Sequence, residues 1–365
     1  MKLLHISSAR TWRGGEQQIA YLIESLQQKN ILQWVICVKQ SAMEEYCQKQ
    51  NIPHYSYAKV FSVNPVPALL IARIAKKHAI DLIHIHDSHS HTFSCMAASF
   101  FGCSIPMALS RRVDFRIQQN ALSKWKYNHP SIKAILCVSH FIKTVLEKDL
   151  SNLDRIKVVH SGIDLEKFSF KQFGILRKEF NIDPSIKIIA NVAAIAPHKD
   201  YFTFVDTAEI LLKKELPLIF LMIGADGGEQ EKIKTYIQQK GLTKKILFTG
   251  FRKDIPQILP EIDCLLFTSK TEGLGTSLLD TIACRIPIVA TQAGGIPEII
   301  IHQKTGLLAP VKDALALAKQ VELLLANKVL QNTLSENALH HLQHFSKEKM
   351  AVKTLQIYQS LIHSS

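Results

Sequence analysis

Short apolar runs alternate with longer amphipathic stretches along the chain. Six runs in the first half have the length and composition of buried strands: Lys2–Ile6, Trp34–Val38, Leu82–His86, Ile105–Leu109, Ala134–Val138 and Ile156–Val159. Five more follow in the second half: Ile186–Val192, Leu218–Ile223, Ile246–Thr249, Cys264–Phe267 and Ile286–Ala290. Helical periodicity is clearest between them at Glu16–Gln28, Tyr201–Lys214, Glu229–Lys240 and Ala314–Ala326.

This alternation predicts an α/β fold in which parallel sheets are covered by helices on both faces. Two sets of five or six strands predict two doubly wound, Rossmann-like domains, and a length of 365 residues agrees with that number. We expect the linker at Phe168–Gly174, just after the turn Ser161-Gly162-Ile163-Asp164.

Composition narrows the class of protein. A hydrophobic content of 47% and a charged content of 21% are ordinary for a folded soluble chain. No apolar run reaches the length of a membrane-spanning helix, and the first residues read as a strand and not as a signal peptide, so we expect a cytoplasmic protein. The seven cysteines include no C-x-x-C pair, which favours buried, reduced thiols.

The formal net charge of +13 is concentrated in the first half of the chain. Residues 1–170 carry 21 Lys and Arg against 12 Asp and Glu, whereas residues 171–365 carry 23 against 19. A basic first half suits an anionic partner, such as a phosphorylated acceptor or an acidic membrane surface. The sequence contains no signature of a nucleic-acid-binding module, so we expect no nucleic-acid partner.

The most informative stretch runs from Glu272 to Asp280 and reads E-G-L-G-T-S-L-L-D. A glycine loop precedes small hydroxyl residues that open a helix, and an acid stands at each end of the stretch. The unpaired amides and the positive dipole of a helix start can hold a diphosphate without a metal. The two acids can then bind hydroxyl groups, one on a sugar and one on a ribose. The pattern therefore predicts a site for a nucleotide sugar.

Other segments of the second half also follow strands, and most are rich in glycine. They are Ala196–Asp200 with Lys199, Gly224–Gly228, the triplet Gly250, Phe251 and Arg252, and Gly294–Glu298. Because the carboxyl ends of parallel strands share one edge of a sheet, we expect these loops to surround the Glu272 loop. Lys199 is then a phosphate-binding cation, and the Gly250 triplet offers backbone groups to a nucleobase. Each glycine taken alone is equally well explained by a tight turn.

In the first half, Gly14 and Gly15 follow the first strand and open a helix. Backbone amides there can approach a phosphate or an acceptor closely. The segment reads R-G-G-E and not G-x-G-x-x-G, so it is no dinucleotide-binding fingerprint. A plain strand-to-helix turn explains the two glycines equally well.

Four histidines, His84, His86, His89 and His91, crowd around the end of another strand. We expect His84 and His86 to share one face of the strand and the other two to lie on the following loop. No second cluster of carboxylate or thiolate ligands accompanies them, so we predict no metal site. A single histidine that lines a ligand cleft, His86, is the preferred interpretation.

Two arginines, Arg111 and Arg112, follow the strand at Ile105–Leu109. A guanidinium at a strand end is well placed to bind phosphate oxygens with two parallel hydrogen bonds. Nearby Arg116 and Lys124 are equally well explained as solvated surface charges.

In their order and spacing, the motifs between Asn191 and Pro310 resemble those of the retaining glycosyltransferases of family 4, which have the GT-B fold. A weaker resemblance covers nearly all of the remaining chain. It implies two facing Rossmann-like domains, an acceptor-binding domain at residues 1–168 and a nucleotide-sugar-binding domain at residues 169–344. Residues 345–365, with a helix at Ser346–His363, would pack back on the first domain.

The resemblance also implies roles for single residues. Glu272 contacts the hydroxyls of the donor sugar, Lys199 binds phosphate and Asp280 binds the ribose. Loop and helix-start groups would face the diphosphate from Gly273, Gly275, Thr276, Ser277 and Leu278. Gly14 and Gly15 match the family's N-terminal glycine loop, and His84-x-His86 matches its histidine-containing strand end. The donor is a substrate, so neither a cofactor nor a metal is implied.

The chain departs from the family pattern at three positions. Asp280 replaces the usual glutamate, Ala194 replaces an arginine that precedes the lysine, and Arg111 stands where a histidine is common. We hypothesise that Arg111 or Arg112 supplies the missing positive charge across the cleft.

The expected reaction is transfer of a sugar from a nucleotide diphosphate sugar to a glycan or lipid-linked acceptor, with retention of configuration by same-face attack. The basic first domain, with Trp12, Arg13 and the 111–127 segment, suits an acceptor at the inner face of a membrane, as in lipopolysaccharide or other surface polysaccharide synthesis. Two alternatives stay open: a nucleotide-sugar epimerase of similar architecture, and a binding protein of this fold without activity.

Overall fold

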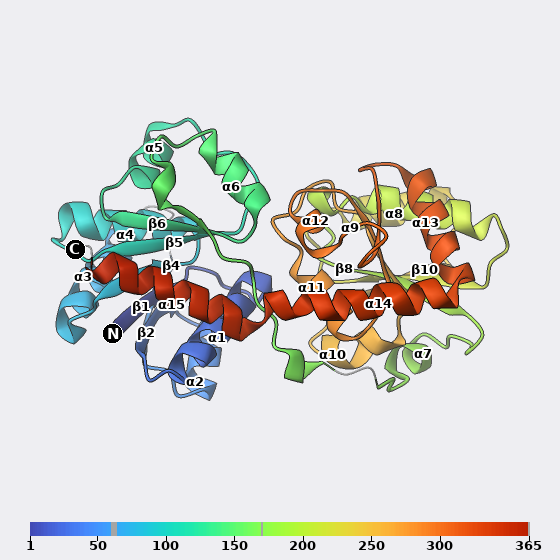
Figure 1. The fold of residues 1–365 in the computed structure, drawn as a ribbon, viewed down its shortest axis with the longest axis horizontal. Helices are drawn as coiled ribbons and strands as arrows, with labels where there is room; N and C mark the ends of the chain where they lie inside the picture. Colours follow the sequence, from blue (N-terminus) through green and yellow to red (C-terminus); the bar gives the residue numbers. More distant parts are fainter. Residues whose placement is uncertain (60–63, 169–170, 364–365) are drawn as a thin grey trace. The chain divides into compact units, whose positions relative to one another are not determined.

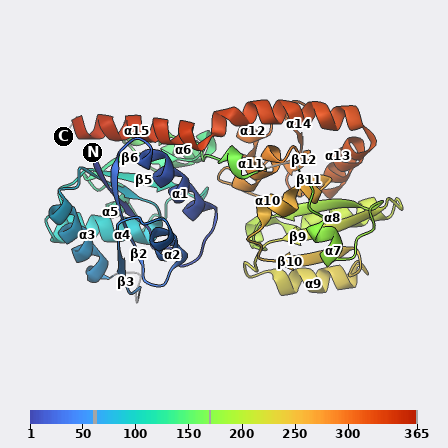
Figure 2. The ribbon, with the colours of Figure 1, turned by 90° about the horizontal axis from the view of Figure 1, so that it is seen from below.

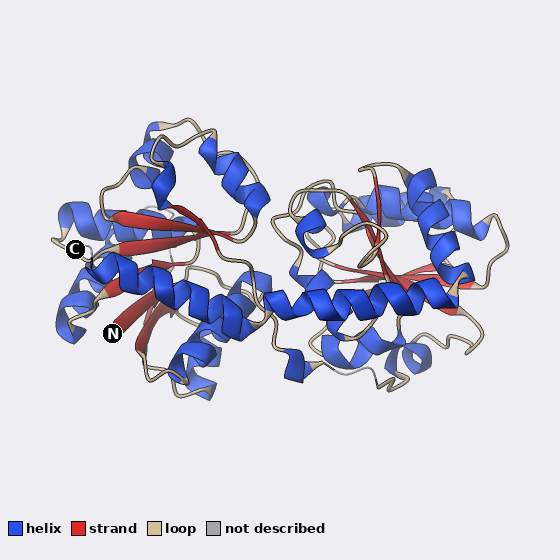
Figure 3. Ribbon diagram, viewed as in Figure 1, coloured by secondary structure: helices blue, strands red, loops and turns tan. Residues whose placement is uncertain are grey.

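The chain forms two compact units in a computed structural model that describes residues 1–59, 64–168 and 171–363. Unit 1 comprises Met1–Gly162 with Lys347–Ser365, and unit 2 comprises Ile163–Ser346 (Figure 1). Each unit contains one parallel sheet flanked by helices, which is the expected α/β class (Figure 3). Residues 169 and 170 of the expected linker lie outside the described residues.

The sheet of unit 1 has seven parallel strands in the order β3-β2-β1-β4-β5-β6-β7. Their bounds are β1 Lys2–Ile6, β2 Leu32–Val38, β3 His54–Tyr57, β4 Leu82–Ile85, β5 Met107–Arg111, β6 Ile132–Cys137 and β7 Ile156–Val158. The edge strand β3 was not predicted, because its sequence HYSY has no apolar run.

The helices of unit 1 are α1 Gly14–Gln27, α2 Ala42–Lys49, α3 Pro65–His78, α4 Ser88–Phe100, α5 Ala121–Tyr127, α6 His140–Glu147 and α15 Lys347–His363, with a short 3-10 turn at Leu153–Arg155. Helix α15 lies along one face of the sheet and contacts α1, whereas α3 and α4 lie on the opposite face (Figure 2). Residues Ala351 and Tyr358 of α15 are fully buried in a core that includes Leu3 and Leu82. The last helix is therefore part of the hydrophobic core of unit 1.

The sheet of unit 2 has six parallel strands in the order β10-β9-β8-β11-β12-β13. Their bounds are β8 Lys187–Val192, β9 Leu218–Ile223, β10 Ile246–Gly250, β11 Cys264–Phe267, β12 Ile288–Thr291 and β13 Leu307–Ala309. Strand β13 was not predicted because only three residues form it. The strand order reverses between β8 and β11, and ligands of open α/β sheets bind at such a point, outside the carboxyl ends of the strands.

The helices of unit 2 are α7 Ile175–Glu179, α8 Tyr201–Leu212, α9 Gln230–Gln239, α10 Ile255–Ile258, α11 Thr276–Ala283, α12 Ile296–Ile299, α13 Ala314–Ala326 and α14 Lys328–Leu342; 3-10 turns lie at Leu165–Lys167, Pro197–Lys199, Leu259–Glu261 and Gln343–Phe345. Alternate residues of β8 bury against the two helical layers. Ile189 packs with α8, α9 and α13, while Ile188 and Ala190 pack with α7 and α10.

All seven cysteines are buried free thiols, in agreement with the expectation from their spacing. Within the described ranges, no helix combines the length and the apolar character that crossing a bilayer requires.

Candidate active site

Lys199 and Glu272 meet at the point of unit 2 where the strand order reverses. Lys199 ends the 3-10 turn that follows β8, and Glu272 lies on the loop that follows β11. Their side chains form a direct ion pair, and each side chain is only about 15% exposed (14% and 15%). The Lys199 ammonium also lies 5.1 Å from the centre of the Phe267 ring. The two residues predicted for phosphate and sugar binding are therefore in contact.

Hydrogen bonds fasten these two loops to each other. The Thr268 hydroxyl donates toward the backbone carbonyl oxygens of Lys199 and Asp200, 3.1 Å from each. The Lys270 amide donates to the His198 carbonyl at 2.8 Å, and its ammonium pairs with Asp200 at 3.2 Å. The backbone positions of Lys199 and Glu272 are consequently set before a ligand arrives.

A second glycine loop, after β12, packs directly on the Glu272 loop. Gly294 has a φ of +54°, and a Cβ at this position would lie 2.1 Å from the carbonyl oxygen of Glu272. A Cβ on Gly295 would lie 2.3 Å from the carbonyl oxygen of Gly273, and the Gly295 amide donates to Glu272 O at 2.9 Å. Glycine is required here because two backbones touch.

Helix α11 begins immediately after the Glu272 loop without a side-chain cap. Gly275 is its N-cap residue, with a φ of +92° and no capping hydrogen bond from a side chain in the described chain. Thr276 and Ser277 are half-buried at the first turn, and the Leu278 amide bonds back to Gly275 O at 3.0 Å. An uncapped helix start of this kind can bind an anionic group through its amides.

Asp280, on the same helix, has a carboxylate without a protein partner. No hydrogen bond or ion pair of this group exists among residues 1–59, 64–168 and 171–363. Burial raises the pKa of Asp280 to about 7, because desolvation penalises the charged form. The Asp280 carboxylate can therefore accept a hydrogen bond from a hydroxyl group, and it titrates near neutral pH.

Gly250 is the last residue of β10, and Phe251 and Arg252 follow the strand. The Gly224 amide donates to Gly250 O at 3.0 Å, so the loops after β9 and β10 lie side by side. Phe251 is exposed, whereas the Arg252 guanidinium pairs with Asp254 and Glu179, each at 2.7 Å. Arg252 is therefore held by two acids within the protein, and its side chain has an ion-pairing role that the sequence did not indicate.

In unit 1, Gly14 and Gly15 begin α1, and Arg112 lies beside them. The Cδ atom of Arg112 is 3.8 Å from the position of a Cβ on Gly15. Within the described residues Arg112 makes no hydrogen bond or ion pair, and its Nε is buried without a partner. Burial lowers the pKa of Arg112 to about 10, against the raising effect of Glu16. Arg112 therefore has a guanidinium that is free to bind an anion.

Arg111 has a different environment. Its side chain is buried, donates to the Tyr127 hydroxyl at 2.6 Å and donates to the carbonyl oxygen of Phe115. The guanidinium also lies 4.9 Å from the centre of the Phe115 ring. Of the two arginines proposed to supply the positive charge across the cleft, Arg111 is thus hydrogen-bonded to its own loop and to α5.

The histidines divide into two groups. The rings of His84 and His86 lie 3.9 Å apart on one side of the sheet, as expected, and burial lowers the pKa of both. They are joined by His5 of β1, which the sequence did not reveal as a neighbour; burial lowers its pKa to about 4. His89 and His91 belong to α4 and not to a loop. His86 is only 6% exposed, so it is buried within unit 1.

Two family models match the chain. "Glycosyltransferase Family 4" matches residues 12–167, and "Glycosyl transferases group 1" matches residues 172–341. The chain belongs to glycosyltransferase family 4. It is accordingly an enzyme of the glycosyltransferase class, as the motifs around Glu272 predicted.

Similar proteins extend over most of the chain. The N-acetyl-alpha-D-glucosaminyl L-malate synthase of Bacillus anthracis is 25% identical over 87% of this chain and 84% of its own length. The UDP-Gal:alpha-D-GlcNAc-diphosphoundecaprenol alpha-1,3-galactosyltransferase of Escherichia coli is 24% identical over 73% of this chain and 71% of its own. The crystal structure of Anabaena Alr3699/HepE in complex with UDP and glucose has a TM-score of 0.87 at 18% identity and covers 99% of this chain and 100% of its own. The likeness confirms the GT-B fold.

Proposed function

We propose that this glycosyltransferase moves a sugar from a nucleotide diphosphate sugar to a glycan or lipid-linked acceptor, with retention of configuration. The observation that carries the proposal is the Lys199–Glu272 ion pair beside the uncapped start of α11. One cation, one acid and a row of free amides converge where the strand order reverses. This set matches a diphosphate joined to a hydroxyl-rich sugar.

The ion pair explains how the donor is recognised. A diphosphate bound at the start of α11 offers Lys199 a second anionic partner, which loosens the hold of Lys199 on Glu272. The Glu272 carboxylate is then free to accept hydrogen bonds from sugar hydroxyls. Asp280, one turn further along α11, binds the ribose through its free carboxylate.

Lys199 and the helix start also stabilise the departing diphosphate. Negative charge grows on the leaving phosphate as the anomeric carbon gains oxocarbenium character. Glu272 is engaged with sugar hydroxyls, so no carboxylate in this loop serves as a covalent nucleophile. The acceptor hydroxyl attacks from the side that the diphosphate leaves, and the leaving phosphate takes its proton.

The acceptor is assigned to unit 1, where the positive charge of the chain is concentrated. Arg112 beside Gly14 and Gly15 offers a free guanidinium to a phosphorylated group. The relative from Escherichia coli is named for a diphosphoundecaprenol-linked acceptor, which supports a lipid-linked substrate for this chain. We place the reaction in bacterial lipopolysaccharide or other surface polysaccharide synthesis, in the cytoplasm at the inner face of an anionic membrane.

The decisive experiment combines transfer assays with nucleotide binding. Glu272→Ala should lower kcat/KM for sugar transfer by roughly 10²-fold or more, because it removes a contact to the reacting sugar. It should leave binding of the free nucleoside diphosphate at least as tight, because Lys199 no longer has a competing carboxylate partner. Glu322→Gln, which alters an exposed ion pair with Lys214, is the matched control. Equal loss of nucleotide binding in Glu272→Ala would contradict the sugar-contact role.

Two further measurements separate the alternatives. NMR of the new linkage should show the anomeric configuration of the donor; an inverted product overturns the same-face mechanism. Incubation with the nucleotide sugar alone should yield no epimer, since an epimerase acts without an acceptor. Screening UDP, GDP and ADP by thermal stabilisation identifies the nucleotide, because a ligand that binds the native state raises Tm.

A further inference from the structure

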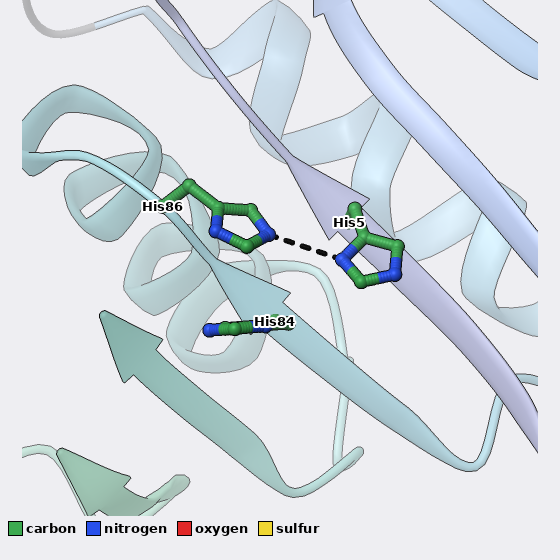
Figure 4. A group of neighbouring side chains, drawn as sticks. All are labelled: His5, His84 and His86. Carbon is green, nitrogen blue, oxygen red and sulfur yellow. Dashed lines mark hydrogen bonds between the residues drawn. The ribbon is translucent and has the colours of Figure 1, made fainter. Parts of the chain in front are cut away.

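Three histidine rings, from β1, from β4 and from the residue just past the end of β4, converge inside unit 1 (Figure 4). His5 of β1 and His84 of β4 are directly paired in the sheet, and His86 lies two positions further on. One ring nitrogen of each residue lies within 4.8 Å of the other two, and the three residues are between 0% and 6% exposed. We infer that this cluster binds one first-row transition-metal dication, with Zn²⁺ the best match.

His5 has a ring nitrogen that is prepared to bind a metal. The Gln33 amide nitrogen donates to the Ile23 carbonyl at 3.0 Å, which orients the Gln33 carbonyl oxygen toward His5. This oxygen lies 3.0 Å from His5 Nε2 and can only accept, so Nε2 carries the proton of the uncharged ring. The lone pair of His5 is therefore on Nδ1, which faces the other histidines. A second hydrogen bond of this kind accompanies most metal-binding histidines.

His86 has a nitrogen to spare. Its Nε2 lies 3.0 Å from His5 Nδ1, whereas its Nδ1 is buried without a partner among the described residues. A metal bound between His5 and His86 replaces the hydrogen bond that now joins them, and the His86 proton moves from Nε2 to Nδ1. Two nitrogens on one tetrahedral Zn²⁺ lie about 3.3 Å apart, so the rings need separate by only a few tenths of an ångström.

The third ring brings oxygen groups close to the cluster. His84 Nδ1 is hydrogen-bonded to the hydroxyl of Tyr358, and its Nε2 lies 2.8 Å from the Ser110 hydroxyl. Whichever nitrogen of His84 binds the metal, the other keeps a hydroxyl partner. Imidazole nitrogens favour Zn²⁺, Co²⁺, Ni²⁺ or Cu²⁺ and disfavour Mg²⁺ and Ca²⁺, which prefer oxygen ligands.

The site is separate from the donor-binding residues. Its ligands belong to unit 1, whereas Lys199, Glu272 and α11 belong to unit 2. A metal held by these rings joins β1 to the end of β4 within unit 1. Its function is thus to stabilise unit 1, and the positive charge of Arg112, close to His84 and His86, limits its affinity.

Cobalt is a direct probe of this site. The full chain, stripped of metal with a chelator, should bind one Co²⁺ with the intense visible bands of four-coordinate geometry, and Zn²⁺ should displace it and raise the Tm of unit 1. His86→Gln should abolish the bands. His340→Gln, which alters an exposed histidine outside the cluster, should retain them.

Arg112→Met supplies an independent readout should His86→Gln fail to fold. Removing the neighbouring positive charge should tighten Co²⁺ binding by roughly tenfold. A buried hydrogen-bond network without metal affinity would show no such effect. The proposal is overturned if the wild-type chain binds no Co²⁺, if His340→Gln removes the bands while His86→Gln retains them, or if Arg112→Met leaves the Kd unchanged.

Discussion

The carboxylates of Glu272 and Asp280 are eight positions apart in sequence but differ in their electrostatic environments. Glu272 is paired with Lys199, so a ligand must compete with an existing charge. Asp280 has no cation beside it, and burial alone raises its pKa to about 7. The ion pair of Glu272 therefore depends on whether the donor phosphate is bound, whereas the charge of Asp280 depends on pH.

This difference predicts the pH dependence of stability at Asp280. The folded pKa is about 7 and the ordinary value is 3.8, so the folded state binds the proton more tightly than the unfolded state. The contribution of Asp280 to the free energy of unfolding therefore declines as pH rises from about 4 to about 7. Asp280→Asn should lose this decline, and urea unfolding at pH 5 and pH 8 measures it.

Asp226→Asn is the control for this comparison, since Asp226 is exposed and its hydrogen bonds with backbone amides lower its pKa. If the free energy of unfolding changed equally with pH in the wild-type chain and in Asp280→Asn, Asp280 would not hold its proton near neutral pH.

The chemical types of the site residues were predictable from sequence, whereas their partners were not. The spacing from Glu272 to Asp280 indicated two acids around a helix start. The sequestration of Arg111 by Tyr127, and of Arg252 by Glu179, depends on contacts 16 and 73 positions away. His5 was missed for the same reason, because it meets His86 only through the pairing of β1 with β4.

At the scale of elements, the glycine loop after β12 decides where the Glu272 loop lies. A Cβ on Gly294 would overlap the Glu272 carbonyl oxygen at 2.1 Å, so Gly294→Ala should displace Glu272. We expect it to lower transfer activity by at least tenfold and to reduce the free energy of unfolding by about 1–3 kcal/mol. Kinetics and chemical denaturation measure the two effects.

Gly241→Ala separates backbone strain from the steric clash. Gly241 has a φ of +69°, similar to that of Gly294, but no atom lies within 4 Å of its Cβ position. Gly241→Ala should therefore lower the free energy of unfolding, as Gly294→Ala does, but retain transfer activity. If both variants kept full activity, the packing of the Gly294 loop would not position Glu272.

The elements themselves were largely predictable, because buried parallel strands read as continuous apolar runs. Strands β1, β9 and β11 have the expected bounds, as does helix α13. The failures were β3 and β13, which are short strands at the edges of their sheets. An edge strand has fewer neighbours to bury against, so its sequence carries a weaker hydrophobic signal.

At the scale of the whole molecule, unit 1 is built from both ends of the chain. Deleting residues 347–365 should destabilise unit 1 and spare unit 2, because Ala351 and Tyr358 belong to the core of unit 1. Hydrogen exchange should become faster in β1 and β4 and stay unchanged in β8 and β9. Lys353→Ala, at an exposed position of α15, should leave both units protected. Equal loss of protection in both units would contradict this division.

The discontinuity of unit 1 affects the order in which the protein is made. A ribosome completes residues 1–162 early, yet it makes the nineteen residues from Lys347 onward only after all of unit 2. Unit 2, although second along the chain, therefore has all of its residues before unit 1 does. Until α15 is synthesised, the apolar face formed by Leu3, Leu82 and Tyr21 stays exposed. The nascent chain therefore carries an aggregation-prone apolar surface for most of its synthesis. The second unit along the chain can therefore complete its fold before the first.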